Sequence, residues 1–95
     1  MGAAIAKVMQ SSLYRDLVHR AMGSATRRCV ELRCLRSEVA RAHDDEGVLR
    51  VDNQLAAIRT AGDQVVHGAA DLGSLECELE RAAALAEALR RQVRS

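Results

Sequence analysis

The fold is decided most clearly by residues 75–93, LECELERAAALAEALRRQV. Alanine, leucine, glutamate and arginine dominate this stretch, and they favour a helix because they lose little conformational freedom in it. Its apolar residues recur every three or four positions, which places them on one helical face. They are Leu75, Leu79, Ala82, Ala86, Leu89 and Val93. The stretch therefore predicts an amphipathic helix that packs through its apolar side.

The same spacing occurs in three segments upstream, so the sequence predicts an all-α chain. The first predicted helix covers residues 3–22, with Ile5, Val8, Met9, Leu13, Leu17 and Ala21 on one side. Gly23 is expected to end it, and Ser24 to cap a second helix with Ala25, Cys29, Leu32, Leu35 and Val39. The third helix carries Val48, Val51, Leu55, Ile58, Val65 and Ala69.

Two polar or glycine-rich stretches separate these segments. The acidic turn of residues 43–47 follows the second helix, and its carboxylates suit the positive end of the next one. Gly68, Gly73 and Ser74 predict a break before residue 75, since each glycine weakens a helix by about 1 kcal/mol. A single coiled-coil-like helix over residues 48–93 stays open as the alternative.

Composition limits how this chain can be stabilised. Among 95 residues there is one tyrosine and no other aromatic residue, so the core must consist of aliphatic side chains. A chain of this size has a narrow stability margin, which a partner can widen. The three cysteines are an odd number without zinc-site spacing, which favours a reducing compartment. No apolar run approaches the roughly 18 residues of a membrane span.

Charge is distributed unequally between the two halves. Residues 1–43 hold eight basic and three acidic side chains, whereas residues 44–95 hold six basic and ten acidic ones. The overall net charge is only +1. This asymmetry predicts an acidic partner for the first half.

Two motifs in the basic half resemble those of a known family. Leu13-Tyr14-Arg15 is followed by an apolar pair and Arg20, and Leu35-Arg36 is followed by Val39 where that family commonly has phenylalanine. Over residues 5–70 the chain resembles the LYR-motif family, also called the complex I LYR family, of small mitochondrial proteins. The resemblance implies a three-helix antiparallel bundle over residues 1–70, with residues 71–95 as a C-terminal helical extension.

The resemblance also implies a function without catalysis. Family members bind an acidic acyl carrier protein and anchor it to larger assemblies in respiration, iron–sulfur cluster assembly or mitoribosome assembly. Respiratory complex I (NADH dehydrogenase) is the first assembly to consider here, with the chain as an accessory subunit in the mitochondrial matrix or on the matrix face of the inner membrane. The chain would need no cofactor of its own, because the partner presents the acyl-phosphopantetheine.

The resemblance and the charge pattern together assign two groups of residues. The expected partner-binding residues are Leu13, Tyr14, Arg15, Arg20, Arg27, Arg28, Arg33, Arg36 and Arg41. Those expected to line a tunnel for the acyl chain are Leu17, Cys29, Leu32, Val39, Leu55 and Ile58. Small aliphatic side chains would leave room for such a chain.

Two other functions compete with the adaptor hypothesis. The first is a coiled-coil scaffold that self-associates through residues 48–93. The second is a basic helical nucleic-acid binder, which the lack of stacking aromatic residues disfavours. Catalytic motifs are not found, and His19, His43 and His67 lack metal-site spacing. We therefore expect neither an enzyme nor a metal protein.

Overall fold

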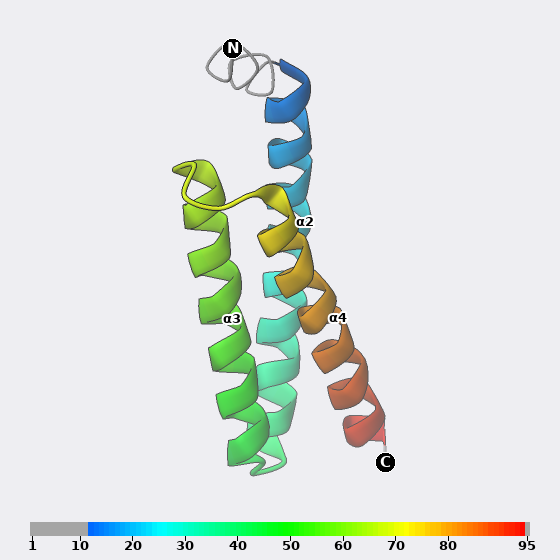
Figure 1. The fold of residues 1–95 in the computed structure, drawn as a ribbon. Helices are drawn as coiled ribbons and strands as arrows, with labels where there is room; N and C mark the ends of the chain where they lie inside the picture. The colour runs from blue at the N-terminus through cyan, green and yellow to red at the C-terminus, as the bar shows by residue number, and fades with distance from the viewer. Residues whose placement is uncertain (1–11, 95) are drawn as a thin grey trace.

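The computed structural model describes residues 12–94, and these residues form three α-helices and no strand. They are α2 (Ser12–Arg41), α3 (Asp45–Val66) and α4 (Leu72–Arg94). Figure 1 shows α2 descending, α3 returning beside it and α4 descending along both. Each helix contacts the other two. The all-α prediction is confirmed, while residues 3–11 of the first predicted helix lie outside the described residues.

The predicted break at Gly23-Ser24 is wrong, because α2 continues through both residues. The apolar stripe runs on without a change of register, from half-buried Ala21 and Met22 to buried Ala25. Its packing outweighs the helix penalty of about 1 kcal/mol for a glycine. Ser24 caps nothing here, since its hydroxyl accepts a hydrogen bond of 3.2 Å from Arg27 instead.

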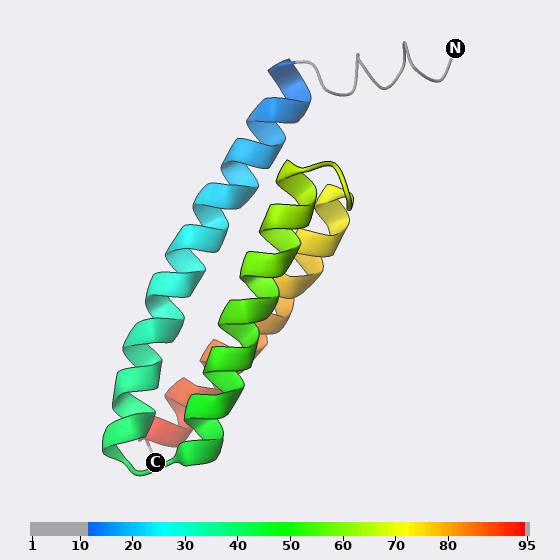
Figure 2. The ribbon, with the colours of Figure 1, turned by 90° about the vertical axis from the view of Figure 1, so that its left-hand side faces the viewer.

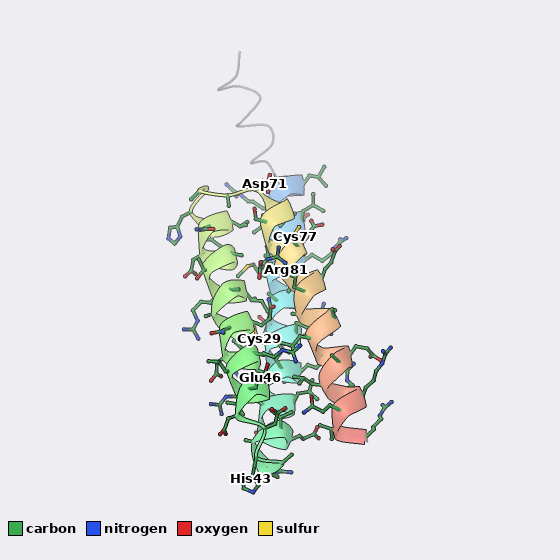
Figure 3. The ribbon with its side chains drawn as sticks, turned by 60° about the horizontal axis from the view of Figure 1, so that its bottom comes forward. Cys29, His43, Glu46, Asp71, Cys77 and Arg81 are labelled. Carbon is green, nitrogen blue, oxygen red and sulfur yellow. The ribbon has the colours of Figure 1, made fainter. Side chains whose placement is uncertain are left out.

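A tight turn joins α2 to α3. His43, at its tip in Figure 3, has a φ of 60°, and the Asp44 carboxylate accepts a hydrogen bond of 2.9 Å from the Gly47 backbone N–H. That bond and the interaction with the Gln92 amide lower the pKa of Asp44. A Cβ atom on residue 47 would clash with the Asp44 carboxylate, so the cap requires glycine here. The acidic turn thus caps α3 as its sequence predicts.

The break between α3 and α4 lies where the glycines predict it. Val66 ends α3, Gly68 has a φ of 73°, and α4 begins at Leu72. Asp71, labelled in Figure 3, accepts a hydrogen bond of 3.1 Å from the Ser74 backbone N–H. The alternative of one continuous helix over residues 48–93 is therefore wrong. The segment predicted over residues 75–93 is the third described helix, because the first two predicted helices are one.

The core between the helices is aliphatic and draws on all three. Leu32, Val51, Leu75 and Leu89 are each 0% exposed. Around them lie Ala25, Leu35, Val39, Ile58, Ala61, Val65, Ala82, Leu85 and Ala86, all buried. All three helices contribute to these buried residues, and α4 contributes the largest share. The α2–α3 pair and α4 therefore bury their apolar faces against each other.

Polar contacts tie the helices at their edges. Arg36 of α2 bonds both carboxylate oxygens of Asp52 on α3, at 2.7 and 3.2 Å. Arg90 of α4 pairs with Glu31 of α2. The Gln92 side chain of α4 donates to Asp44 in the α2–α3 turn. These contacts join α2 to α3, α4 to α2, and α4 to the α2–α3 turn.

Candidate partner-binding site

One end of α2 extends beyond the other two helices. The 30 residues of α2 correspond to about 45 Å, against about 33 and 34 Å for the 22 and 23 residues of α3 and α4. Figures 1 and 2 show the start of α2 rising past the end of α3 and the start of α4. We call residues 12–20 the overhang.

Exposed apolar side chains gather at this end of the molecule. Leu13 is 69% exposed and Leu17 42% exposed on the overhang, and Val66 at the end of α3 is 60% exposed. Only three other large apolar side chains of the described residues are exposed, Val30, Leu49 and Val93. The overhang therefore continues the apolar stripe of α2 past the point where α3 and α4 cover it.

A groove of about 620 Å³ lies between the overhang and the end of α3. We call it the overhang groove. Val18, Met22 and Val65 give it apolar walls, and all three pack against the core. Exposed Arg15, His19 and His67 add basic or titratable groups at its edge, while half-buried Tyr14 supplies a ring and a hydroxyl. Val66 and Gly68 complete the lining. The groove can hold an apolar group that is joined to an anionic one.

The structure brings only some of the predicted partner-binding residues together. Leu13, Tyr14, Arg15 and Arg20 share the overhang, whereas Arg36 lies about 31 Å from Arg15 along the same helix. The remaining arginines, Arg27, Arg28, Arg33 and Arg41, are spread along the rest of α2. The two motifs that carry the family resemblance therefore do not form a single site within α2.

Two of these arginines form ion pairs inside the chain. Arg28 pairs with Glu31, three residues along α2. The Asp52 carboxylate holds Arg36 by two hydrogen bonds, which raises the pKa of Arg36 and lowers the pKa of Asp52. A partner that recruits Arg36 would have to break its bond with Asp52.

The predicted tunnel residues do not line one passage. Leu32, Val39 and Ile58 are only 0%, 1% and 3% exposed and belong to the packed core. Cys29 and Leu55 are half-buried against that core. Leu17 lies on the overhang, about 33 Å from Val39 along α2. An acyl chain among the core residues would have to displace side chains of α4.

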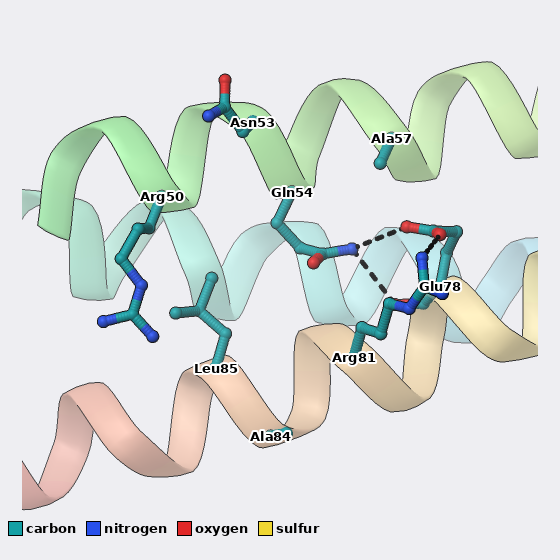
Figure 4. Close-up of a pocket in the computed structure, with 8 residues that line it drawn as sticks. All are labelled: Arg50, Asn53, Gln54, Ala57, Glu78, Arg81, Ala84 and Leu85. Carbon is teal, nitrogen blue, oxygen red and sulfur yellow. Dashed lines mark hydrogen bonds and ion pairs between the residues drawn. The ribbon is translucent and has the colours of Figure 1, made fainter. Parts of the chain in front are cut away.

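A second hollow, of about 590 Å³, lies between α3 and α4 (Figure 4). Its polar groups bond to one another: the Gln54 amide donates to the Glu78 carboxylate at 3.1 Å, and Arg81 pairs with that carboxylate at 2.7 Å. Gln54 also donates to the Glu78 backbone carbonyl at 3.2 Å. These groups join the two helices.

The cysteines and the possible metal ligands of residues 12–94 are dispersed over the three helices and the turns between them. Cys29 is half-buried, Cys34 and Cys77 are exposed, and all three are free thiols. Within the described residues, three or more histidine, cysteine, aspartate or glutamate side chains nowhere come close enough to hold a metal ion. None of the described helices is both long enough and apolar enough to span a bilayer.

Several residues that line the overhang groove were not predicted as site residues from the sequence. His19, Met22, Val65, Val66 and His67 line it, yet none was assigned to a site. No signal in the sequence marks them, because the apolar pattern of the third predicted helix continues past Val65 to Ala69. Their role depends on the length of α2 relative to α3.

Comparisons with known proteins add no relative. No protein-family model matches the sequence, and neither the curated proteins nor the solved structures give a match. The site is therefore argued from its own residues.

Proposed function

We propose that this chain is a non-catalytic helical adaptor that binds an acidic protein partner at the overhang groove. The observation that carries this proposal is the position of Tyr14 and Arg15, two residues of the Leu13-Tyr14-Arg15 motif, in the wall of that groove. The motif resemblance makes an acylated acyl carrier protein the first partner to test. The proposed setting is the mitochondrial matrix, with respiratory complex I as the larger assembly.

An acylated carrier protein has an anionic part and an apolar acyl chain, and the groove has side chains that suit each of them. Arg15, which lines the groove, is exposed and suits a carboxylate or a phosphate, and Arg20 is exposed elsewhere on the overhang. An exposed ion pair contributes about 0–1 kcal/mol, so these arginines would act mainly on encounter and orientation. Each buried methylene contributes about 0.8 kcal/mol, so an acyl chain against Val18, Met22 and Val65 would supply most of the affinity.

The proposal uses only part of the predicted set of residues. Arg36 is left out, because it is about 31 Å from Arg15 and is held by Asp52. Leu32, Val39 and Ile58 are left to the core. The outer face of α4, with Glu80, Glu87, Arg91 and Arg94 exposed, is the proposed contact with the larger assembly.

Titration of the full chain with a purified acylated carrier protein tests the proposal. Native mass spectrometry should show a one-to-one complex, and calorimetry should give an affinity that falls about tenfold or more in Tyr14→Ala and Arg15→Glu. Arg27→Glu is the matched control, since Arg27 is exposed on the same helix outside the groove. Failure to bind the acylated carrier, or equal losses in Arg27→Glu, would contradict the proposal.

A further inference from the structure

We infer that the overhang also binds a second copy of this chain, as a two-fold pair in which the two overhangs pack antiparallel through Leu13, Tyr14, Leu17 and Val18. In such a pair each overhang fills the space beside the other, and its first turn reaches the Val66–Leu72 end of the other copy. This inference concerns the same end of the molecule as the proposed function but does not depend on it.

The apolar surface of the overhang has the shape that helix pairing requires. Leu13 and Leu17 are one turn apart, as are Tyr14 and Val18, so the four side chains form a continuous stripe. Leu13 and Leu17 are 69% and 42% exposed, and Tyr14 and Val18 are half-buried. Farther along α2 the same stripe is buried by α3 and α4. A second helix is the natural cover for the uncovered part.

The charges beside this stripe are self-complementary. Asp16 and Arg20 are exposed on the same flank of the overhang, one turn apart, and neither has an ion pair among the described residues. When two helices run antiparallel with Val18 near the two-fold axis, residue 16 of one lies opposite residue 20 of the other. Asp16 of each copy then meets Arg20 of its partner, and symmetry makes this contact twice.

The ends of the two bundles are also complementary in charge. The first turns of α2 carry exposed Arg15, while exposed Asp63 and Asp71 lie near the end of α3 and the start of α4. The antiparallel arrangement brings the basic tip of one copy to the acidic end of the other. Because the same patch is used on both copies, the assembly closes as a dimer and does not grow into a filament.

The small area of the overhang limits the expected affinity of the dimer. The nine residues of the overhang span about 13 Å, so the contact falls below the roughly 800 Å² per partner of a standard stable interface. We therefore expect a reversible dimer in the micromolar range or weaker. A bound partner protein at the overhang groove would compete with it.

Sedimentation velocity of the full chain over a concentration series tests this inference. The sedimentation coefficient should rise from the monomer to the dimer value with concentration, and Leu13→Glu/Leu17→Glu should remain monomeric throughout. Val30→Glu and Leu49→Glu are controls, because these side chains are 52% and 60% exposed outside the overhang. A monomer at all concentrations, dimerisation of the double variant, or dissociation by either control would overturn the inference.

A charge exchange separates this contact from general loss of folding. Arg20→Asp alone places one carboxylate from each copy together at both symmetric contacts and should weaken the dimer about tenfold, whereas Asp16→Arg/Arg20→Asp restores the opposite charges and the dimer. If the exchanged variant stays as weak as Arg20→Asp, the two-fold pairing is wrong. Since these measurements use the chain alone, they succeed or fail independently of carrier-protein binding.

Discussion

Asp52 shows how a single residue of α3 makes the fold sensitive to pH. Its carboxylate accepts two hydrogen bonds from Arg36 of α2, and these lower its pKa from an ordinary value of 3.8. A carboxylate whose pKa is lower in the folded state stabilises that state while it is ionised. The stabilising contribution of Asp52 is therefore complete at a pH above the pKa that it has in the unfolded chain. It is lost as pH falls through the lower pKa that Asp52 has in the folded chain. The hydrogen bond from Gly47 likewise lowers the pKa of Asp44, so ionised Asp44 also stabilises the folded state.

We expect Asp52→Asn to be less stable than the native chain at pH 7, and the difference to disappear as pH falls through the lowered pKa of Asp52. The cause is the loss of the charge-assisted contact with Arg36, which the native chain also loses once Asp52 is protonated. Urea denaturation at a series of pH values measures the free energy of unfolding. Since the pair is half-exposed, the midpoint shift should be small against the whole transition.

Glu38→Gln provides the matched control for this pH dependence. Glu38 is exposed on α2 and makes no ion pair or side-chain hydrogen bond among the described residues. Its substitution should change stability little, and equally at every pH. A difference for Asp52→Asn that stays constant down to pH 2 would show that ionisation of Asp52 is not the cause.

At the scale of whole helices, the continuity of α2 leads to a prediction at Gly23. Gly23 lies inside α2, and a Cβ atom added there would meet only the Arg27 guanidinium, at 3.8 Å. Alanine is favoured over glycine in a helix interior by about 0.5–1 kcal/mol. Gly23→Ala should therefore stabilise the chain by about that amount in urea denaturation.

Gly68→Ala is the contrasting variant. Gly68 has a φ of 73° in the α3–α4 loop, and an added Cβ there has no neighbour within 4 Å. Alanine is strained in this left-handed region by about 1–2 kcal/mol, so this variant should lose stability. If Gly23→Ala also lost stability, α2 would be broken at residue 23, as the sequence pattern alone predicts.

These glycines also show how far the sequence predicts the helices. The apolar period placed Leu32, Val39, Val51 and Ile58 on faces that are buried, because burial of a stripe follows directly from helical geometry. Whether a glycine interrupts a helix depends on the packing on both sides of it. Gly68 lies where the apolar stripe ends, whereas Gly23 lies within a stripe that continues.

For the molecule as a whole, the candidate site arises from unequal helix lengths. The overhang exists because α2 has no break at Gly23, and the overhang groove exists because α3 ends at Val66. The sequence showed Leu13, Tyr14 and Arg15 as unusual neighbours, but it assigned Arg36 to the same site. Arg36 is on the same helix some six turns away, which no local pattern reveals. The positions of these residues relative to one another depend on the arrangement of the helices, which the local sequence pattern does not predict.

The shared core predicts that the chain unfolds as one unit. Leu75 at the start of α4 is 0% exposed and belongs to the cluster that includes Leu32 and Val51. Leu75→Ala should cost about 2–5 kcal/mol through the lost contacts and the cavity, a large fraction of a typical total of about 5–15 kcal/mol. Denaturation followed by circular dichroism should show one transition at lower urea. Leu49→Ala, at a side chain that is 60% exposed, should hardly move it. A separate early transition involving about three tenths of the signal from the described helices would instead show that α4 unfolds independently of α2 and α3.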